Sequence, residues 1–352
     1  MAQENLPLLG RSYAEFQALV ATENYPRFTA KQLCEWLYKK CVTEFDAMTN
    51  LSKVLRADLN EKYTLGRSCP LEVHTSRDGT RKYLFAANGE RTVETAMIPD
   101  ADRRTLCVSS QVGCRMHCQF CATGRQPWGG NLSATQILNQ ILSVEESAEL
   151  TNLVFMGMGE PLDNIDELLR VLQVLTAGWG MAMSPRRITV STVGVRKGLE
   201  RFLKESEAHL AISLHTPFED ERRELLPASG GFSLKDLFTL LRTVNWRGQR
   251  KLSFEYVVLA GVNDSARHTE ELIRILRPVP CLVNLISYHP HDGAEFARPK
   301  DIVLARMRDR LNNGGVHTTI RASRGMDIDA ACGLLSTTYQ NSANKEDEVL
   351  TN

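Results

Sequence analysis

From residue 102 onward, short segments rich in β-branched and apolar residues alternate with longer segments in which apolar residues recur at helical spacing. Such alternation predicts parallel strands joined by right-handed helical crossovers. Strands are expected at Thr105–Ser109, Leu153–Phe155, Arg187–Thr192, His209–Ser213, Leu252–Val258, Leu282–Ser287 and Val316–Arg321. Helices are expected at Ser133–Leu150, Ile165–Leu175, Leu234–Val244, Ser265–Leu276 and Asp301–Asn312. Because seven strands are too few to close an eight-stranded barrel, the predicted fold class is α/β with a partial, open (β/α) barrel. Its chemistry is expected at the carboxyl ends of the strands.

Two smaller units precede the predicted barrel. Apolar residues recur at helical spacing from about Ser12 to Tyr63, and from Leu71 to Met97 the period changes to two, with Asp-Gly and Asn-Gly pairs at the expected hairpin turns. We therefore predict a small N-terminal helical accessory domain that binds RNA, a short antiparallel β meander, the barrel and a polar tail, at residues 1–68, 69–101, 102–336 and 337–352. A basic edge of the helical domain is as compatible with a solvated surface as with RNA.

The charges of the chain balance, with 42 Lys+Arg against 42 Asp+Glu, so any contact with nucleic acid must come from a local patch. No apolar run approaches the roughly twenty residues of a membrane span. The first residues lack the basic and then apolar layout of a signal peptide, so we expect a cytoplasmic protein. The nine cysteines are an odd number, which argues against a disulfide framework.

Three of the nine cysteines form a C-x₃-C-x₂-C triad, at Cys114, Cys118 and Cys121, directly after the first predicted barrel strand. Structural zinc requires four ligands, and His117 is adjacent to Cys118, a spacing unsuited to joint chelation. Three thiolates on a [4Fe–4S] cluster would leave one iron open to a non-protein ligand. The pattern therefore favours an iron–sulfur cluster over zinc.

The triad, together with Gly157-Met-Gly-Glu-Pro161 after the second predicted strand, resembles the radical S-adenosylmethionine (SAM) enzymes. Further segments resemble the RlmN/Cfr family of that superfamily, with RlmN the closer branch: Cys107–Cys114, Phe155–Leu162, Ser213–His215 and Asp327–Gly333. The resemblance runs from about residue 10 to 335. It implies one [4Fe–4S] cluster per chain on the three cysteines of the triad, SAM as cofactor, and methylation of adenine C2 in 23S rRNA, with tRNA as a further substrate.

The resemblance also implies the reaction. C2 of adenine is electron-poor and cannot attack a methyl group as a nucleophile, so the family uses a radical. One SAM methylates Cys332. A second SAM, cleaved reductively at the cluster, gives a radical that takes hydrogen from this methyl group, and the resulting carbon radical adds to C2. Cys107 then forms a disulfide with Cys332 and releases the RNA, and Glu94 matches the general base. Contacts with SAM are implied at Gly159, Glu160, Ser191, Ser213, Leu214, His215 and His289.

The chain departs from the family pattern at three places. His289 stands where an asparagine is usual, Leu334 stands where a glutamine usually follows the cysteine-glycine pair, and Pro127–Gly130 replaces a Gly-Phe-x-Arg segment. These changes leave in place the residues for the cluster, SAM and the two thiols. An alternative is therefore a related enzyme with the same chemistry and a different RNA target. Two other functions stay open from the sequence: a Cfr-like methylation of adenine C8, and a non-catalytic iron–sulfur or zinc RNA-binding protein. A binding protein needs neither Cys332 nor Cys107.

The expected partners are 23S rRNA, tRNA and an electron donor such as flavodoxin or ferredoxin, with no membrane contact, and we expect a monomer. Phosphate contacts that position the RNA are expected from basic residues near the barrel mouth. These residues are Arg103, Arg104, Arg186, Arg187, Arg321 and Arg324.

Overall fold

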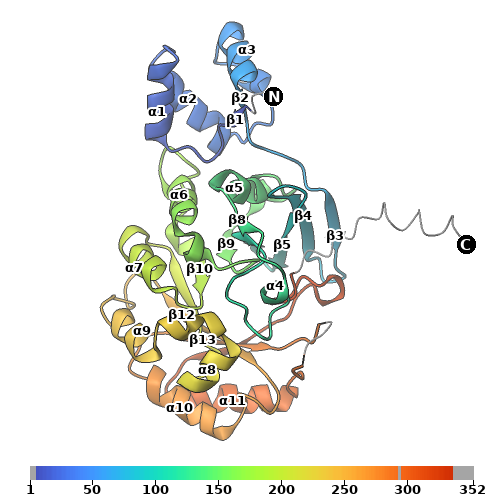
Figure 1. Cartoon of the computed structure of the whole chain (residues 1–352), viewed down its shortest axis with the longest axis vertical. Coiled ribbons are helices and arrows are strands. Elements are labelled where there is room, and N and C mark those ends of the chain that lie inside the picture. Colours follow the sequence, from blue (N-terminus) through green and yellow to red (C-terminus); the bar gives the residue numbers. More distant parts are fainter. Residues whose placement is uncertain (1–4, 292–294, 336–352) are drawn as a thin grey trace, which may run out of the picture.

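The computed structural model describes residues 5–291 and 295–335, and a ten-stranded sheet forms its centre, in the order β14-β13-β12-β11-β10-β9-β6-β5-β4-β3 (Figure 1). The seven strands from β14 to β6 pair in parallel, and the four from β6 to β3 pair antiparallel. The strands of this sheet are β3 (Glu72–Thr75), β4 (Arg81–Ala86), β5 (Thr92–Asp100), β6 (Arg103–Cys107), β9 (Asn152–Phe155), β10 (Ile188–Thr192), β11 (His209–Ser213), β12 (Leu252–Val258), β13 (Leu282–Ser287) and β14 (Thr318–Arg321). The parallel part is the predicted open (β/α) barrel. It ends on one side at β14 and continues on the other into the meander.

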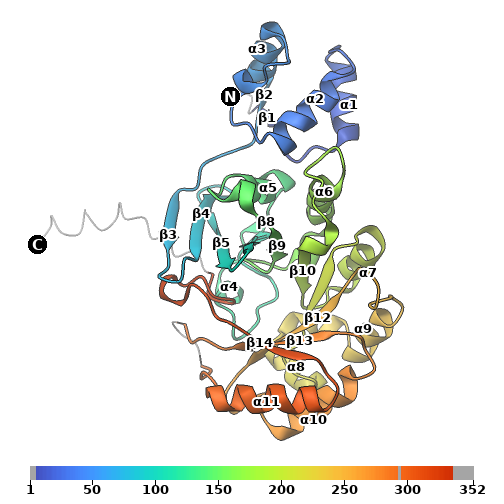
Figure 2. The same cartoon turned by 180° about the vertical axis from the view of Figure 1, so that it is seen from behind.

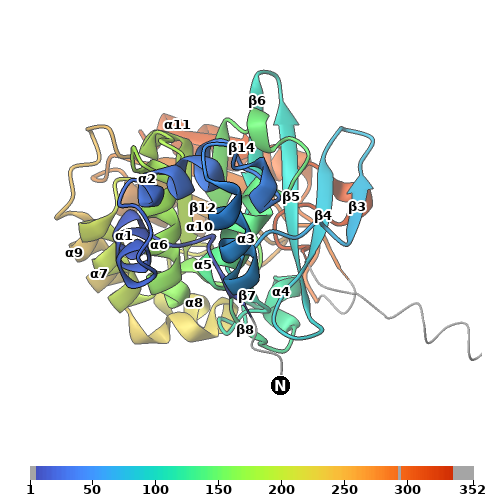
Figure 3. The ribbon, with the colours of Figure 1, turned by 90° about the horizontal axis from the view of Figure 1, so that it is seen from above.

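Crossover helices lie on the outside of the parallel strands. Each turns an apolar face to the sheet; α6 (Ile165–Thr176), for example, buries Leu168, Val171 and Leu172. The other helices of the barrel are α7 (Arg196–Glu205), α8 (Glu219–Leu225), α9 (Leu234–Leu241), α10 (Ala266–Leu276) and α11 (Asp301–Asn313), with 3-10 turns η4 (Pro161–Asn164), η5 (Pro185–Arg187), η6 (Pro227–Gly231) and η7 (Met326–Ile328). Seen from above, α7 and α9 lie on one side of the molecule and the meander strand β3 lies on the other (Figure 3).

The first predicted barrel helix is shorter than expected. Helix α5 (Ala134–Leu142) ends eight residues before the predicted boundary, and only the short 3-10 turn η3 (Ser147–Glu149) follows. The guanidinium of Arg67 donates to the carbonyl oxygen of Leu142, which satisfies an acceptor at the helix end. Glu145 and Glu146 instead form ion pairs with Arg81 of β4. These tertiary contacts stop the helix although its apolar spacing continues.

The meander β3–β5 extends the barrel sheet beyond β6. Its two predicted hairpin turns contain Gly79 and Gly89, whose φ angles are 84° and 64°. Such positive φ angles favour glycine, which explains the position of both turns. The side chains of Tyr83 and Phe85 on β4 are buried in the main core.

The N-terminal helices gather at one end of the molecule, opposite α10 and α11 (Figure 2). They are α1 (Tyr13–Thr22), α2 (Thr29–Cys34) with a π-helical turn η1 (Glu35–Lys39), η2 (Phe45–Ala47) and α3 (Lys53–Lys62), beside the two-residue parallel strands β1 (Leu6–Pro7) and β2 (Tyr63–Thr64). Polar contacts dock this unit on the barrel: Glu15 pairs with Arg170 of α6, and the hydroxyl of Thr135 donates to the carbonyl of Leu9 (2.7 Å). No helix within the described residues is long and apolar enough to cross a membrane. The predicted tail, 337–352, lies outside the described residues.

Candidate functional site

A pocket lies at the carboxyl ends of the parallel strands, where this fold predicts the chemistry. Residues at or after the ends of β9, β10, β11 and β13 line it, together with the cysteine loop. Of the residues expected to contact SAM, six line this pocket: Gly159, Glu160, Ser191, Ser213, His215 and His289. Leu214 does not line it, because its side chain is fully buried in the apolar core. Successive residues at a strand end point to opposite sides, so Ser213 and His215 face the pocket while Leu214 faces away.

The three cysteines of the triad line the same pocket from one short loop. This loop leads from β7 (Gln111–Val112) to the one-turn helix α4 (Ala122–Arg125), and β7 pairs with β8 (Gly130–Asn131). The chain turns sharply at His117, whose φ of 51° is left-handed. Nδ1 of His117 lies 3.1 Å from the carbonyl oxygen of Gly124, and His117 does not line the pocket. Among the described residues, all cysteines are free, and no three His, Cys, Asp or Glu side chains converge as ligands of a single metal ion would.

Gly159 and Glu160 form the pocket wall after β9. A Cβ atom at Gly159 would lie 2.4 Å from Cβ of Gln111, and the φ of 95° also favours glycine, so this turn packs closely on β7. Glu160 is buried, and its two carboxylate oxygens accept hydrogen bonds from the backbone N–H groups of Leu162 (3.0 Å) and Val193 (2.9 Å). Burial raises the pKa of this carboxyl to about 7, although the N–H donors act in the opposite direction.

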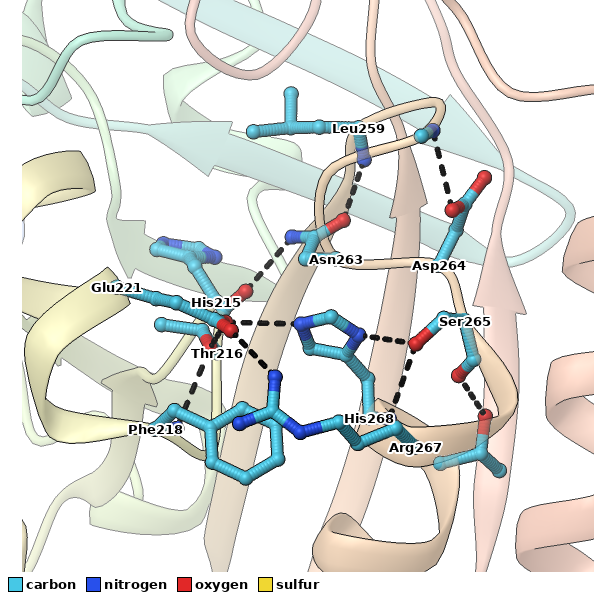
Figure 4. Close-up of polar contacts among 12 residues, drawn as sticks. His215, Thr216, Phe218, Glu221, Leu259, Asn263, Asp264, Ser265, Arg267 and His268 are labelled. Carbon is cyan, nitrogen blue, oxygen red and sulfur yellow. Dashed lines mark hydrogen bonds and ion pairs between the residues drawn. The ribbon is translucent and has the colours of Figure 1, made fainter.

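His215 is held by a polar network that joins it to Asn263 of the loop after β12 (Figure 4). Its Nδ1 accepts a hydrogen bond from the backbone N–H of Val257 (3.0 Å), and its carbonyl accepts one from the side-chain amide of Asn263 (2.7 Å). Burial, and then the charge of Arg222, lower the pKa of His215 to about 3, so the imidazole is neutral with its proton on Nε2. Phe120 of the cysteine loop packs edge-on against this ring, with centroids 4.7 Å apart.

The same network joins two loops of the barrel. Glu221 of α8 accepts hydrogen bonds from Thr216 (2.6 Å) and Arg267 (3.1 Å), and it lies 2.8 Å from the imidazole of His268 on α10. Figure 4 shows these side chains between the loop after β11 and the start of α10. The loop that carries His215 is therefore fixed to the next crossover.

Arg222 is a residue that the sequence analysis missed. Its guanidinium is buried below the pocket and donates to the carbonyl oxygens of Val193 (2.7 Å) and Ser213 (3.0 Å), which ties the ends of β10 and β11 together. Burial lowers its pKa to about 10, while the charge of Glu219 and then the Cys118 sulfur act in the opposite direction. In the sequence it lies in the charged segment Glu219–Glu224, where nothing distinguishes it from a solvated arginine.

Cys332 lies on a C-terminal loop that is pinned on two sides. On the meander side, Ser76 donates to the carboxylate of Asp327 (2.5 Å), and Asp78 accepts from the backbone N–H of Gly325 (2.9 Å). On the other side, the N–H of Ala122 in α4 donates to the carbonyl of Gly333 (2.8 Å). These contacts bring Cys332 into the pocket of the triad from more than two hundred residues away.

Cys107 is buried at the end of β6, and Arg321 is half-buried at the end of β14, on the opposite edge of the open barrel. The Arg321 guanidinium extends across to Met156, with Nη1 3.3 Å from the sulfur. Burial and then the neighbouring Cys332 sulfur raise the pKa of the Cys107 thiol to about 12, while Arg321 acts in the opposite direction. The two thiols and the arginine thus lie close enough to interact, and both thiols are free in this structure.

Comparisons with known proteins agree with this arrangement. Residues 108–274 match the radical SAM superfamily, and residues 6–65 match the N-terminal domain of the ribosomal RNA large subunit methyltransferases. A Porphyromonas gingivalis protein named "Probable dual-specificity RNA methyltransferase RlmN" is 51% identical over 98% of this chain and 97% of its own length. The chain belongs to the RlmN family of radical SAM methyltransferases.

Two further relatives support the assignment to the RlmN family. The "Dual-specificity RNA methyltransferase RlmN" of Geobacter sulfurreducens is 39% identical over 94% of this chain and 92% of its own length. A crystal structure of a radical SAM methyltransferase from Sphaerobacter thermophilus has a TM-score of 0.88 at 39% identity and covers 94% of this chain and 99% of that chain. As a radical SAM methyltransferase, the chain works with a [4Fe–4S] cluster and SAM and acts on RNA. The RlmN branch, rather than Cfr, is the one that matches, and a purely RNA-binding role is excluded.

Two residues implied by the RlmN resemblance sit in unexpected surroundings. Glu94 is buried on β5 and forms an ion pair with Lys82 (3.0 Å) instead of being solvated, and it does not line the pocket. His289 lines the pocket, but its Nε2 lies 2.6 Å from the hydroxyl of Ser323, and burial lowers its pKa. The other two departures from the RlmN pattern lie apart from this wall: Leu334 is buried, and Trp128 of the 127–130 segment is exposed beside Arg115.

The prediction that six arginines lie near the mouth of the barrel is wrong for five of them. Arg103, Arg104, Arg186 and Arg187 lie at the amino ends of β6 and β10, at the opposite end of the barrel. Arg321 lies inside the pocket rather than at its rim. The first four residues precede or begin their strands in the sequence. The length of a strand separates the residues at its start from those that follow its end, where the SAM pocket lies.

Proposed function

We propose that this chain methylates C2 of an adenine in 23S rRNA, and of an adenine in tRNA, through a methyl group carried by Cys332. One observation carries the proposal: residues as far apart in sequence as Cys114, Glu160 and Cys332 line a single pocket. A methylated thiol is useful only beside a group that can generate a radical, and the triad of thiols is in the same pocket. The names of the relatives, which describe dual-specificity RNA methyltransferases, support two RNA substrates.

The residues present fit the two cofactors. Cys114, Cys118 and Cys121 offer three free thiols to one pocket, and soft thiolates are the ligands of iron–sulfur clusters. Three protein ligands leave one iron for SAM. When bound, the cluster and SAM supply a carbon radical, which electron-poor C2 requires. The buried carboxylate of Glu160 suits the ammonium group of SAM, and we assign the other SAM contacts to Gly159, Ser191, Ser213, His215 and His289. Leu214 supports this wall from the core.

The two thiols have different tasks. Cys332 lines the pocket and carries the methyl group, whereas Cys107 lies deeper and releases the product by forming a disulfide with Cys332. Arg321 stabilises negative charge on the Cys107 sulfur. We keep Glu94 as the candidate base on the resemblance to RlmN alone; its buried carboxylate pairs with Lys82 (3.0 Å).

The partners follow from this chemistry. A reductive step needs an electron donor, and we propose flavodoxin or ferredoxin, with the chain acting as a monomer in the cytoplasm. The N-terminal unit, residues 1–68, is the part that we expect to hold the RNA, and its match to the N-terminal domain of ribosomal RNA methyltransferases supports this. The meander, 69–101, then serves to pin the Cys332 loop to the barrel, 102–336.

Mass spectrometry of RNA tests the proposal. Purified chain, reconstituted with iron and sulfide and supplied with SAM and a reductant, should convert an adenosine in a 23S rRNA fragment to 2-methyladenosine. 8-Methyladenosine at that position, or no methylated adenosine with protein that carries the cluster, would overturn it.

A further inference from the structure

A second cavity lies at the other end of the barrel. It has a volume of about 1180 Å³ and is lined by residues at the amino ends of β6, β9, β10, β11, β12 and β13. Three residues, Met156, Glu255 and Arg321, line both this cavity and the SAM pocket, so they form the layer between the two. We call this second cavity the lower mouth. No step of the proposed reaction uses it.

The lower mouth is lined by five exposed cations from three separate loops. They are Arg103, Arg186, Arg187, Arg247 and Lys251. In the part of the chain that the structure describes, none of the five forms an ion pair. Two arginines elsewhere on the surface form ion pairs and serve for comparison: Arg201 with Asp166 and Glu205, and Arg274 with Glu271.

The acidic residues of the lower mouth do not balance these charges. Asp102 is exposed at the rim. Glu255 is buried at the floor, where one of its oxygens accepts from Ser253 (2.9 Å) and Asn284 (2.8 Å) and the other has no hydrogen-bond partner. His209 also lines the lower mouth, and its pKa is lowered first by burial and then by the positive charges of Lys251, Arg250 and Arg186. Like charges held together repel one another, and a bound anion would offset that repulsion.

We propose that the lower mouth is a phosphate-binding site that holds the backbone of the substrate RNA, at the end of the barrel opposite the adenine pocket. This inference rests on the proposed function for its RNA. Four of the five cations are arginines, whose planar fork matches phosphate oxygens. A chain without net charge must collect its phosphate contacts locally, and the lower mouth is such a collection. Cations that stand on three loops around an open cavity suit several successive phosphates better than one small anion. Such contacts position RNA without reading its sequence.

Salt-dependent binding tests the lower mouth. The variant R186Q/R187Q/R247Q/K251Q is compared with the wild type and with a matched control, R201Q/R274Q, which removes two paired surface arginines. The probe is a 23S rRNA fragment. The logarithm of the association constant falls linearly with the logarithm of salt concentration. Each lost phosphate contact makes this negative slope shallower by about 0.7–0.9, so the slope of the quadruple variant should be shallower by about 3. Kd should rise by at least about tenfold at about 0.15 M salt, and the control should bind like the wild type.

Other occupants give different results. If the quadruple variant binds RNA like the wild type, the inference is overturned. A variant that keeps RNA binding but no longer binds inorganic pyrophosphate would show a site for a small anion. A variant that keeps RNA binding but loses turnover with an acidic electron carrier would show a docking site for that carrier. Melting temperature and iron content check that the variant is folded. If it is not, the single variants R186Q and K251Q should each make the slope shallower by about 0.7–0.9, and unchanged slopes in both would overturn the inference. A wild type that binds RNA with the full slope and makes no methyladenosine would contradict the proposed function alone.

Discussion

At the scale of single residues, the pocket is defined by side chains whose roles depend on what lies next to them. Cys114, Cys118 and Cys121 could be recognised by their spacing, because three thiols within eight residues have few other uses. Arg222 could not be recognised, and Arg321 was predicted only as a phosphate contact, because the surroundings of both side chains are created by strands that meet only in the fold. The lower mouth could not be predicted from the sequence either, because its cations lie far apart in the chain and only the folded sheet brings them to one cavity.

Replacing any one cysteine of the triad by alanine should remove the cluster. Because each thiolate binds a separate iron, the loss of one exposes the cluster to solvent and to degradation. We expect iron content to fall from about four atoms per chain to below about one, with loss of RNA methylation. Iron and sulfide assays check this, and Cys69→Ala, which removes an exposed cysteine outside the pocket, is the control. Normal iron content and full activity in a triad variant would refute the ligand assignment.

The release step should become faster as the pH rises. The folded pKa of Cys107 is about 12, above its usual value, so the thiol is almost fully protonated at neutral pH. Between about pH 7 and 9 the fraction of thiolate grows about tenfold per unit, and the rate of release should follow. Arg321→Met removes a cation that lowers the pKa of Cys107, so release should be slower in this variant. Arg321→Lys keeps a positive charge, so its release rate should lie between those of Arg321→Met and the wild type. Rapid-quench single-turnover measurements check both; a pH-independent release rate would contradict release limited by the raised pKa of Cys107.

At the scale of elements, the strands β11, β12 and β13 begin and end at the predicted residues, because β-branched segments bounded by polar turns are a local signal. The end of α5 was predicted wrongly, because Arg67 and Arg81 act on it from outside the segment. The loops at the carboxyl ends are held by side chains such as Asn263, whose importance is visible only in the fold. Its amide donates to the carbonyls of His215 and Val257, and its oxygen accepts from the N–H of Leu259, each at 2.7 Å.

Asn263→Ala should therefore destabilise the whole barrel. The change leaves three buried backbone groups without partners, which costs about 2–4 kcal/mol of the free energy of unfolding. Urea unfolding measures this cost. Asp264→Ala, which removes one bond from the N–H of Gly261 (3.1 Å) at the surface, should cost less than about 1 kcal/mol. Equal stability of the two variants would contradict the role given to the network in Figure 4.

At the scale of the whole molecule, three parts converge on one pocket. The barrel supplies the triad and the strand ends, and the meander pins the C-terminal loop through Ser76 and Asp78. The folded pKa of Asp78 is about 2, below its ordinary value of 3.8, because hydrogen bonds from Gly325 and Thr80 outweigh burial. The contribution of Asp78 to the free energy of unfolding is therefore complete above pH 4 and is lost as the pH falls toward 2.

The open-barrel architecture and the motifs could be predicted from the sequence. The pinning of the Cys332 loop could not, because its contacts join residues about 250 positions apart.

The central claim is that Cys332 carries the methyl group and Cys107 releases the product, and one gel tests both. Cys107→Ala can still form the bond from Cys332 to RNA but lacks the thiol that breaks it, and the neighbouring Cys121 thiol is assigned to the cluster. With SAM, reductant and substrate RNA, this variant should accumulate as a slow-migrating, nuclease-sensitive band on a denaturing gel, and the double variant with Cys332→Ala should show none. A Cys107→Ala protein that turns over normally, or a conjugate that persists without Cys332, would contradict the account.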